Sequence, residues 1–235
     1  MKQTITIARR FCGPPDSGNG GYVCGRLASF IDGPAIVRLK APPPLEEELE
    51  VRSADDGVEM ARGNVVFATA KPVQQVRLDI PPAPGFADAE VASRAYIGFH
   101  CHPYSTCFVC GPRRGAGDGL RIFPGPHDGK ALVASPWIPD ATLGDAAGRV
   151  QPVFQWASLD CPGAFTFRLP PRTSMLLGEL AVELKGPVAV GERCVVIGWE
   201  FLHDGRKHHT GTALFGEAGD CRGGGKATWF EVPLR

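Results

Sequence analysis

The chain has 235 residues, which is enough for one large domain or for two domains of ordinary size. Its 25 Lys and Arg residues balance 25 Asp and Glu residues, so there is no basic excess to attract a phosphate backbone, and nucleic acid is not an expected partner. A hydrophobic fraction of 43% is enough for a core, and 30 Gly with 22 Pro predict frequent turns.

The first segment, residues 1–11, alternates apolar and polar residues and then carries Arg9 and Arg10. Alternation predicts a strand, and the segment lacks the unbroken apolar run of a signal peptide. No later stretch is apolar over the length needed to cross a bilayer. Eight cysteines are too few for a disulfide scaffold in a chain of this length. The sequence therefore predicts a cytoplasmic protein with mostly reduced cysteines and no membrane partner.

In chain order, residues 20–31 form the first segment of helix length, and two glycines open it. Residues 37–51 follow as a strand, a proline-containing turn and a second strand. Alternating residues 58–70 come next, and a proline-rich stretch then leads into the second half. There, residues 151–165 again have helix length, with Pro152 at a position where a first-turn proline is tolerated.

An internal repeat links the two halves. Residues 37–51 and residues 182–196 share Val, Leu, Lys, Pro, Glu and Val in register, 145 residues apart. In the second half the block is followed by alternating runs, and Asp204-Gly205 between two of them predicts a hairpin. Each half is thus predicted to be one helix followed by an antiparallel meander, the sign of a duplicated unit.

The predicted fold class is α+β. A helix that is apolar nearly all round must be wrapped, and a curved antiparallel sheet can do this. Two such units, each wrapped around its central helix, can pair edge to edge and continue the sheet. We assign residues 1–80 to the N-terminal unit, 81–105 to the connection and 106–235 to the C-terminal unit.

Several motifs of the second half resemble a known family. They are Cys107-Phe-Val-Cys110-Gly111, Gly119-Leu120-Arg-Ile, Leu180-Ala-Val-Glu-Leu-Lys-Gly-Pro187 and Val190-Gly191-Glu192. They are similar to the opening segment and the central strands of hotdog-fold acyl-CoA thioesterases, in particular of phenylacetyl-CoA-thioesterase-like proteins. The second half matches almost from end to end, and only the helix and two strands of the first half match. The resemblance implies a tandem double hotdog.

The same resemblance implies a catalytic pair: a backbone N–H at the start of the central helix and a carboxylate about two turns later. Aligned from their predicted starts, the two helices place Gly21 opposite Pro152 and Ser29 opposite Asp160. Only Gly21 has an N–H, and only Asp160 has a carboxylate. Because eight helical residues rise about 12 Å, the pair must come from two antiparallel helices. We expect one complete site, with the Gly21 N–H as oxyanion donor and Asp160 as base or nucleophile.

Asn19, Gly20, Ser29 and Gln155 are the predicted substrate-binding residues. Each assignment has a structural alternative. Asp160 could cap a helix end, since Pro162 and Gly163 follow it, and Asn19 could cap the first helix. The glycines at positions 20 and 21 could serve close packing of the helix on the sheet. Asp32 is the substitute carboxylate if the helix alignment is wrong.

A cysteine and histidine cluster near the middle of the chain has zinc-ligand residue types. Cys107-x-x-Cys110 has zinc-ligand spacing, but a structural site commonly needs a second, separate pair. In the sequence that pair would have to come from His100, Cys101 and His102. Cys161 has no neighbouring histidine and is predicted to be a small buried thiol. No metal is expected.

The expected function is hydrolysis of a small or medium acyl thioester. The partner would be an acyl-CoA or an acyl-carrier thioester, with coenzyme A as part of the substrate and no separate cofactor. A non-catalytic hotdog protein that binds acyl thioesters is the alternative, and a 2-enoyl-CoA hydratase is third because its Asp/His helix motif is absent. The sequence leaves open whether two chains form a homodimer.

Overall fold

We describe residues 3–127, 129 and 131–234 of the protein from a computed structural model. One eleven-stranded sheet carries the fold, and all its strand pairs are antiparallel. From one edge to the other, its strands are β1 (Gln3–Thr6), β3 (Glu48–Ala54), β4 (Gly57–Arg62), β5 (Val65–Pro72), β2 (Ala35–Leu39), β8 (Thr173–Leu184), β11 (Cys221–Pro233), β10 (Lys207–Phe215), β9 (Cys194–Asp204), β7 (Leu132–Trp137) and β6 (Gly125–Pro126).

Four α-helices and three short 3₁₀ helices accompany the sheet in the described residues. They are α1 (Gly20–Ala28), α2 (Phe86–Arg94), α3 (Pro152–Ser158), α4 (Cys161–Ala164), η1 (Arg9–Phe11), η2 (Ile97–Phe99) and η3 (Ala141–Leu143). Within the described residues, no helix has both the length and the apolar character needed to cross a membrane.

The two halves of the chain meet at the pairing of β2 with β8. Here Ala35 lies opposite Val182, and Arg38 lies opposite Glu179 and forms an ion pair with it at 2.7 Å. Outward from this pair, the N-terminal side runs β2, β5, β4, β3, β1, and the C-terminal side runs β8, β11, β10, β9, β7, with β6 beyond. The first five strands on each side have the same order: the first, fourth, third and second strand after the central helix, and then the strand that precedes that helix. Residues 37–51 run from β2 into β3, and residues 182–196 run from β8 into β9, so the repeated blocks occupy equivalent places in this order.

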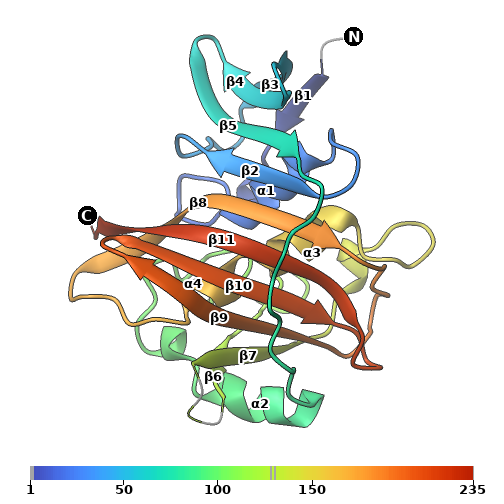
Figure 1. Ribbon diagram of the computed structural model, residues 1–235, viewed down its shortest axis with the longest axis vertical. Coiled ribbons are helices and arrows are strands. Elements are labelled where there is room, and N and C mark those ends of the chain that lie inside the picture. The colour runs from blue at the N-terminus through green and yellow to red at the C-terminus, as the bar shows by residue number, and fades with distance from the viewer. Residues whose placement is uncertain (1–2, 128, 130, 235) are drawn as a thin grey trace.

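The main hydrophobic core lies between the sheet and the central helices α1 and α3. Val23 and Leu27 of α1, Phe154 and Ala157 of α3 and Leu180 of β8 are buried in one cluster. On the opposite face, residues 73–85 cross the strands of the C-terminal half and lead to α2 (Figure 1). Leu78, Ile80 and Ala83 of this segment pack on a second apolar cluster formed mainly by β7, β9 and β10, so the segment covers this face of these three strands.

The sequence predicted one continuous helix over residues 151–165, but the second central helix is interrupted. It is divided into α3 and α4, and Leu159 and Asp160 lie between them. Asp160 has φ −86° and ψ −84°, which is outside the helical region. The interruption turns the Asp160 side chain toward the start of α1 and away from the helix that follows it.

Candidate active site

Helices α1 and α3 cross in very close contact, and glycines on α1 make this possible. A Cβ atom on Gly21 would lie 2.4 Å from Asp160 Cβ and 3.1 Å from Ala157 Cα. One turn further along α1, a Cβ on Gly25 would lie 2.7 Å from Trp156 Cβ and 3.1 Å from Val153 Cα. Residues further along α1 thus contact residues earlier in α3, so the two helices are antiparallel and the start of α1 lies beside the end of α3.

This crossing brings Gly21 and Asp160 together, as the sequence predicted. The Gly21 N–H donates a hydrogen bond to Asp160 Oδ2 at 2.8 Å, and Asn19 Nδ2 donates to the same oxygen at 2.8 Å. The carboxyl group is only 2% exposed, and its second oxygen, Oδ1, has no hydrogen-bond partner in the described part of the chain. Asp160 occupies the N-cap position of α4 without making a capping hydrogen bond, so the capping alternative is wrong.

Asn19 has two functions in this arrangement. Its Oδ1 accepts a hydrogen bond from the Tyr22 N–H at 2.9 Å and caps α1, as predicted from its residue type. Its Nδ2 holds Asp160 and lies 3.7 Å from Cys107 Sγ. The residue that begins the helix therefore also fixes the orientation of the carboxylate.

Burial controls the electrostatics of Asp160. Loss of solvent raises the pKa of its carboxyl group to about 7, and the hydrogen bonds from the Gly21 N–H and Asn19 oppose this rise. Negative charge on the neighbouring Cys107 sulfur raises the same pKa further. A carboxyl group whose pKa is shifted this far by its surroundings is typical of functional sites, although ion-pair networks can also shift pKa values.

The predicted alignment of the two central helices is wrong by one residue. Asn19 is the N-cap of α1 and Gln151 is the N-cap of α3, so Gly21 corresponds to Val153 and not to Pro152. The packing agrees with this register, in which Gly25 corresponds to Ala157. A Cβ added to Gly21 would lie 3.1 Å from Ala157 Cα, and the symmetric counterpart is a Cβ added to Gly25, 3.1 Å from Val153 Cα. In this register Asp160 corresponds to Ala28 and not to Ser29. The argument that Pro152 lacks the donor therefore fails, because Val153 has an N–H.

Among the described residues, the other predicted substrate-binding residues make no hydrogen bond to Asp160. Ser29 is exposed at the end of α1, where its hydroxyl donates to the Arg26 carbonyl at 2.8 Å. Gly20 packs on β8, since a Cβ there would lie 2.8 Å from Leu177 Cδ2, which is the close approach that the sequence allowed for. Gln155 is 3% exposed on α3, and its Oε1 has no partner among the described residues. Their role toward a substrate remains a prediction.

Solved structures share this architecture over nearly the whole chain. A TesB protein of Mycobacterium avium subspecies paratuberculosis aligns with 92% of this chain and 88% of its own, at 12% identity and a TM-score of 0.59. A protein of Alicyclobacillus acidocaldarius, described as having a hot dog fold, aligns with 98% and 93%, at 10% identity and a TM-score of 0.55. The chain has a hotdog fold. A candidate thioesterase of Novosphingobium aromaticivorans is also similar, over 97% of this chain and 94% of its own, at 10% identity and a TM-score of 0.60.

No protein-family model matches the sequence, and the search of curated proteins finds no match either. At the low identities of the solved structures, the likeness establishes the hotdog fold alone. The chemistry of the site has to be argued from its own residues.

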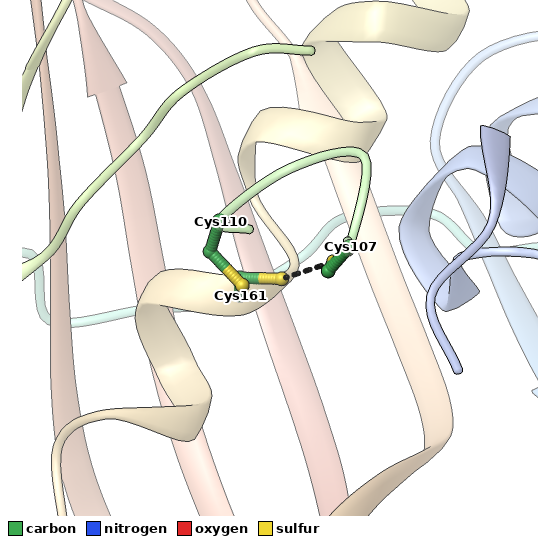
Figure 2. A group of neighbouring side chains, drawn as sticks. All are labelled: Cys107, Cys110 and Cys161. Carbon is green, nitrogen blue, oxygen red and sulfur yellow. Dashed lines mark hydrogen bonds between the residues drawn. The ribbon is translucent and has the colours of Figure 1, made fainter. Parts of the chain in front are cut away.

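The hotdog core also contains a group of thiols that the sequence did not bring together. Cys107 and Cys110, on the loop that precedes β6, point toward Cys161, the first residue of α4 (Figure 2). The three sulfur atoms lie within 4.8 Å of one another, and Cys107 Sγ is 3.8 Å from Cys161 Sγ. Burial raises the pKa of the Cys110 and Cys161 thiols. The pKa of Cys107 is lowered, because the Cys110 and Cys161 thiols and the N–H groups of Cys110 and Val109 hydrogen-bond its sulfur.

Proposed function

We propose that the protein is an acyl-thioester hydrolase built as a tandem double hotdog, with Asp160 as base or nucleophile and the Gly21 N–H as oxyanion donor. The observation that carries the proposal is the contact between a buried carboxylate and the first turn of the opposite central helix. The units would be residues 1–80 and 106–235, joined by 81–105. The equal strand order on both sides of the β2–β8 pair supports the duplication.

The start of α1 has the properties of an oxyanion site. Thioester hydrolysis develops negative charge on the carbonyl oxygen, and a fixed N–H donor stabilises it. Gly21 is the second residue of a nine-residue helix, where the N–H has no partner within the helix and the helix dipole favours negative charge. In the structure this N–H donates a hydrogen bond to Asp160 Oδ2. An incoming carbonyl oxygen would have to replace that oxygen.

Asp160 can supply the second part of the reaction. Acting as a base, it takes a proton from water while the water oxygen attacks the carbonyl carbon. The tetrahedral intermediate then expels the sulfur of the leaving group, which receives the proton from Asp160, so the products are a carboxylic acid and a free thiol. Direct attack by the carboxylate would give an anhydride that water hydrolyses to the same products. The Oδ1 atom, which is buried and has no hydrogen-bond partner in the described residues, is the oxygen that would act in either route once water or substrate reaches it.

The substrate would be an acyl-CoA or an acyl group on the pantetheine of a carrier protein. The direct test is to incubate the purified protein with acyl-CoAs of increasing chain length and with acyl-carrier thioesters, and to measure free thiol. Thiol release that is enzymatic and selective for some acyl groups would support the hydrolase. Absence of turnover with every thioester in both sets would contradict it.

A non-catalytic acyl-thioester-binding protein is the second candidate, and one observation favours it. Asp160 is 2% exposed and its oxygen already occupies the Gly21 N–H, so the described conformation has no open catalytic group. Binding of a non-hydrolysable acyl-CoA analogue without release of thiol from the corresponding thioester would identify this function.

A further inference from the structure

We propose that Cys107, Cys110 and Cys161 bind a thiophilic divalent metal ion, with Zn²⁺ as the best fit. The sequence argued against zinc because it offered Cys107 and Cys110 with no second pair of ligands. The fold supplies the missing thiol from a distant segment: Cys161, at the first residue of α4, points at the loop that carries the other two (Figure 2). This proposal does not depend on the acyl-thioester hydrolase.

The positions of the sulfur atoms fit zinc coordination. Zinc binds thiolates at about 2.3 Å with tetrahedral angles, which places two sulfur ligands about 3.8 Å apart. Cys107 Sγ and Cys161 Sγ are 3.8 Å apart, and the sulfur atoms of all three residues lie within 4.8 Å of one another. All three residues are free cysteines with at most 6% exposure, so the ion would be enclosed in the core.

The loop is shaped to hold the first two sulfurs. Cys107-x-x-Cys110 has the spacing of a zinc-binding turn, and Gly111 allows its tight fold. A Cβ on Gly111 would lie 2.5 Å from both the N and O atoms of Cys107, so no other residue fits there.

Two side chains complete the surroundings of the sulfurs. Asn19 Nδ2 lies 3.7 Å from Cys107 Sγ, and His102 Nε2 lies 3.3 Å from Cys110 Sγ. His102 Nδ1 accepts a hydrogen bond from the Tyr104 N–H at 2.9 Å, so the neutral ring carries its proton on Nε2. His102 is therefore a hydrogen-bond donor to the Cys110 sulfur and not a fourth ligand. Donors of this kind, outside the ligands themselves, orient and tune metal sites.

Three protein ligands leave a fourth position for water or another small ligand. Three ligands and an open position are the pattern of catalytic zinc, whereas structural zinc has four protein ligands. The cluster borders the Asp160 site, because Asn19 contacts both Cys107 and Asp160 and Cys161 follows Asp160 in the chain. The bound ion would also tie the Cys107–Cys110 loop to the start of α4.

A second group of residues with metal-ligand side chains lies on β9 and β10. Glu200, His203 and His208 lie close together. Both ring nitrogens of His208 already have carboxylate partners, Glu200 at 2.6 Å and Glu231 at 2.9 Å. No ring nitrogen of His208 is left for a metal, so this group carries no metal proposal.

The test uses the full chain, purified without chelator and also stripped of metal and titrated with Zn²⁺ or Co²⁺. We expect about one zinc per chain. We also expect a thiolate-to-cobalt charge-transfer absorption when Co²⁺ is added, because thiolates are strong electron donors to this ion. Cys161→Ser should lower the zinc affinity more than about 100-fold, and His102→Ala, which removes only a donor to a sulfur, about 10–100-fold.

Cys194→Ser is the matched control, because Cys194 is equally buried on β9 and lies outside the cluster. Its zinc content should equal that of the parent protein. The cobalt spectrum of the parent protein needs no variant, so it decides the question even if Cys161→Ser does not fold. Absence of both zinc and the charge-transfer absorption would overturn the proposal. Unchanged zinc binding in folded Cys161→Ser, or a disulfide within the cluster of the purified protein, would overturn it as well.

Discussion

The two ends of the crossed helix pair have similar backbones and different side chains. At the start of α1, the Gly21 N–H faces the carboxylate of Asp160 at 2.8 Å. At the start of α3, the equivalent residues are Val153 and Ala28, and Ala28 has no polar side chain. Every helix start presents backbone N–H donors, so the donor distinguishes neither end. The carboxylate is what makes one end a candidate site, and we expect one working site per chain.

The largest expected effect comes from removing the charge of the Asp160 carboxylate beside the start of α1. Asp160→Asn should lower kcat for thiol release by ~10²–10⁴, because the amide cannot act as a base. The variant should still fold, since an amide oxygen can accept the hydrogen bonds from Asn19 and the Gly21 N–H. Thiol-release kinetics together with thermal unfolding measure both. Full activity with an unchanged melting temperature would assign the carboxylate role to another residue.

Gly21→Ala should have the next largest effect. The added Cβ would lie 2.4 Å from Asp160 Cβ, so the two helices or the carboxylate must move. Overpacking of this kind costs about 1–3 kcal/mol of unfolding free energy, and displacement of a catalytic group by about 1 Å can cost about 10²-fold in rate. Both quantities can be measured by denaturant unfolding and by thiol release.

Val153→Ala is the matched change at the opposite end. It keeps the backbone N–H and removes only part of a half-buried side chain, so activity should stay within about twofold of the parent protein. Equal losses of activity in Gly21→Ala and Val153→Ala would remove the distinction between the two ends.

A smaller effect is expected at the N-cap of α1. Asn19→Ala removes the cap on the Tyr22 N–H, worth ~1 kcal/mol of stability, and one of the two hydrogen bonds to Asp160 Oδ2. A hydrogen bond to a charged group is worth about 1.5–3 kcal/mol, so kcat should fall about 10–100-fold. The control is Gln151→Ala at the N-cap of α3, where the side chain makes no capping bond and both effects should be absent. Equal results for the two variants would mean that Asn19 has no special role.

The sequence predicted the partners of the site better than their register. Gly21 and Asp160 could be paired because the resemblance supplied the two groups and helix geometry required them to come from antiparallel helices. The alignment was wrong by one residue because Gly20 and Gly21 offered two possible helix starts, and only the Asn19 cap distinguishes them. The interruption of the second helix at Asp160 was missed, since the conformation that turns its side chain toward α1 depends on contacts with another part of the chain.

The thiol cluster could be found only in part from the sequence. The spacing of Cys107 and Cys110 is a local signal, and it was recognised. Cys161 joins them from a distant segment, and no local pattern specifies that its sulfur will lie 3.8 Å from that of Cys107. The duplication was easier to predict, because the repeated blocks of residues 37–51 and 182–196 contain the same strand and turn signals. The strand order departs from the predicted simple meander, since β2 pairs with β5 and not with β3, and β8 pairs with β11 and not with β9.

The stoichiometry of binding tests most directly whether the two ends of the helix pair differ. A non-hydrolysable acyl-CoA analogue, in which a methylene separates the carbonyl from the sulfur, can be titrated into the protein by calorimetry. We predict one strong site per chain, weakened when Gly21→Ala disturbs the start of α1 and unchanged in Val153→Ala. Two equal strong sites per chain would contradict the account, because they would show that the start of α3 binds thioesters without a carboxylate.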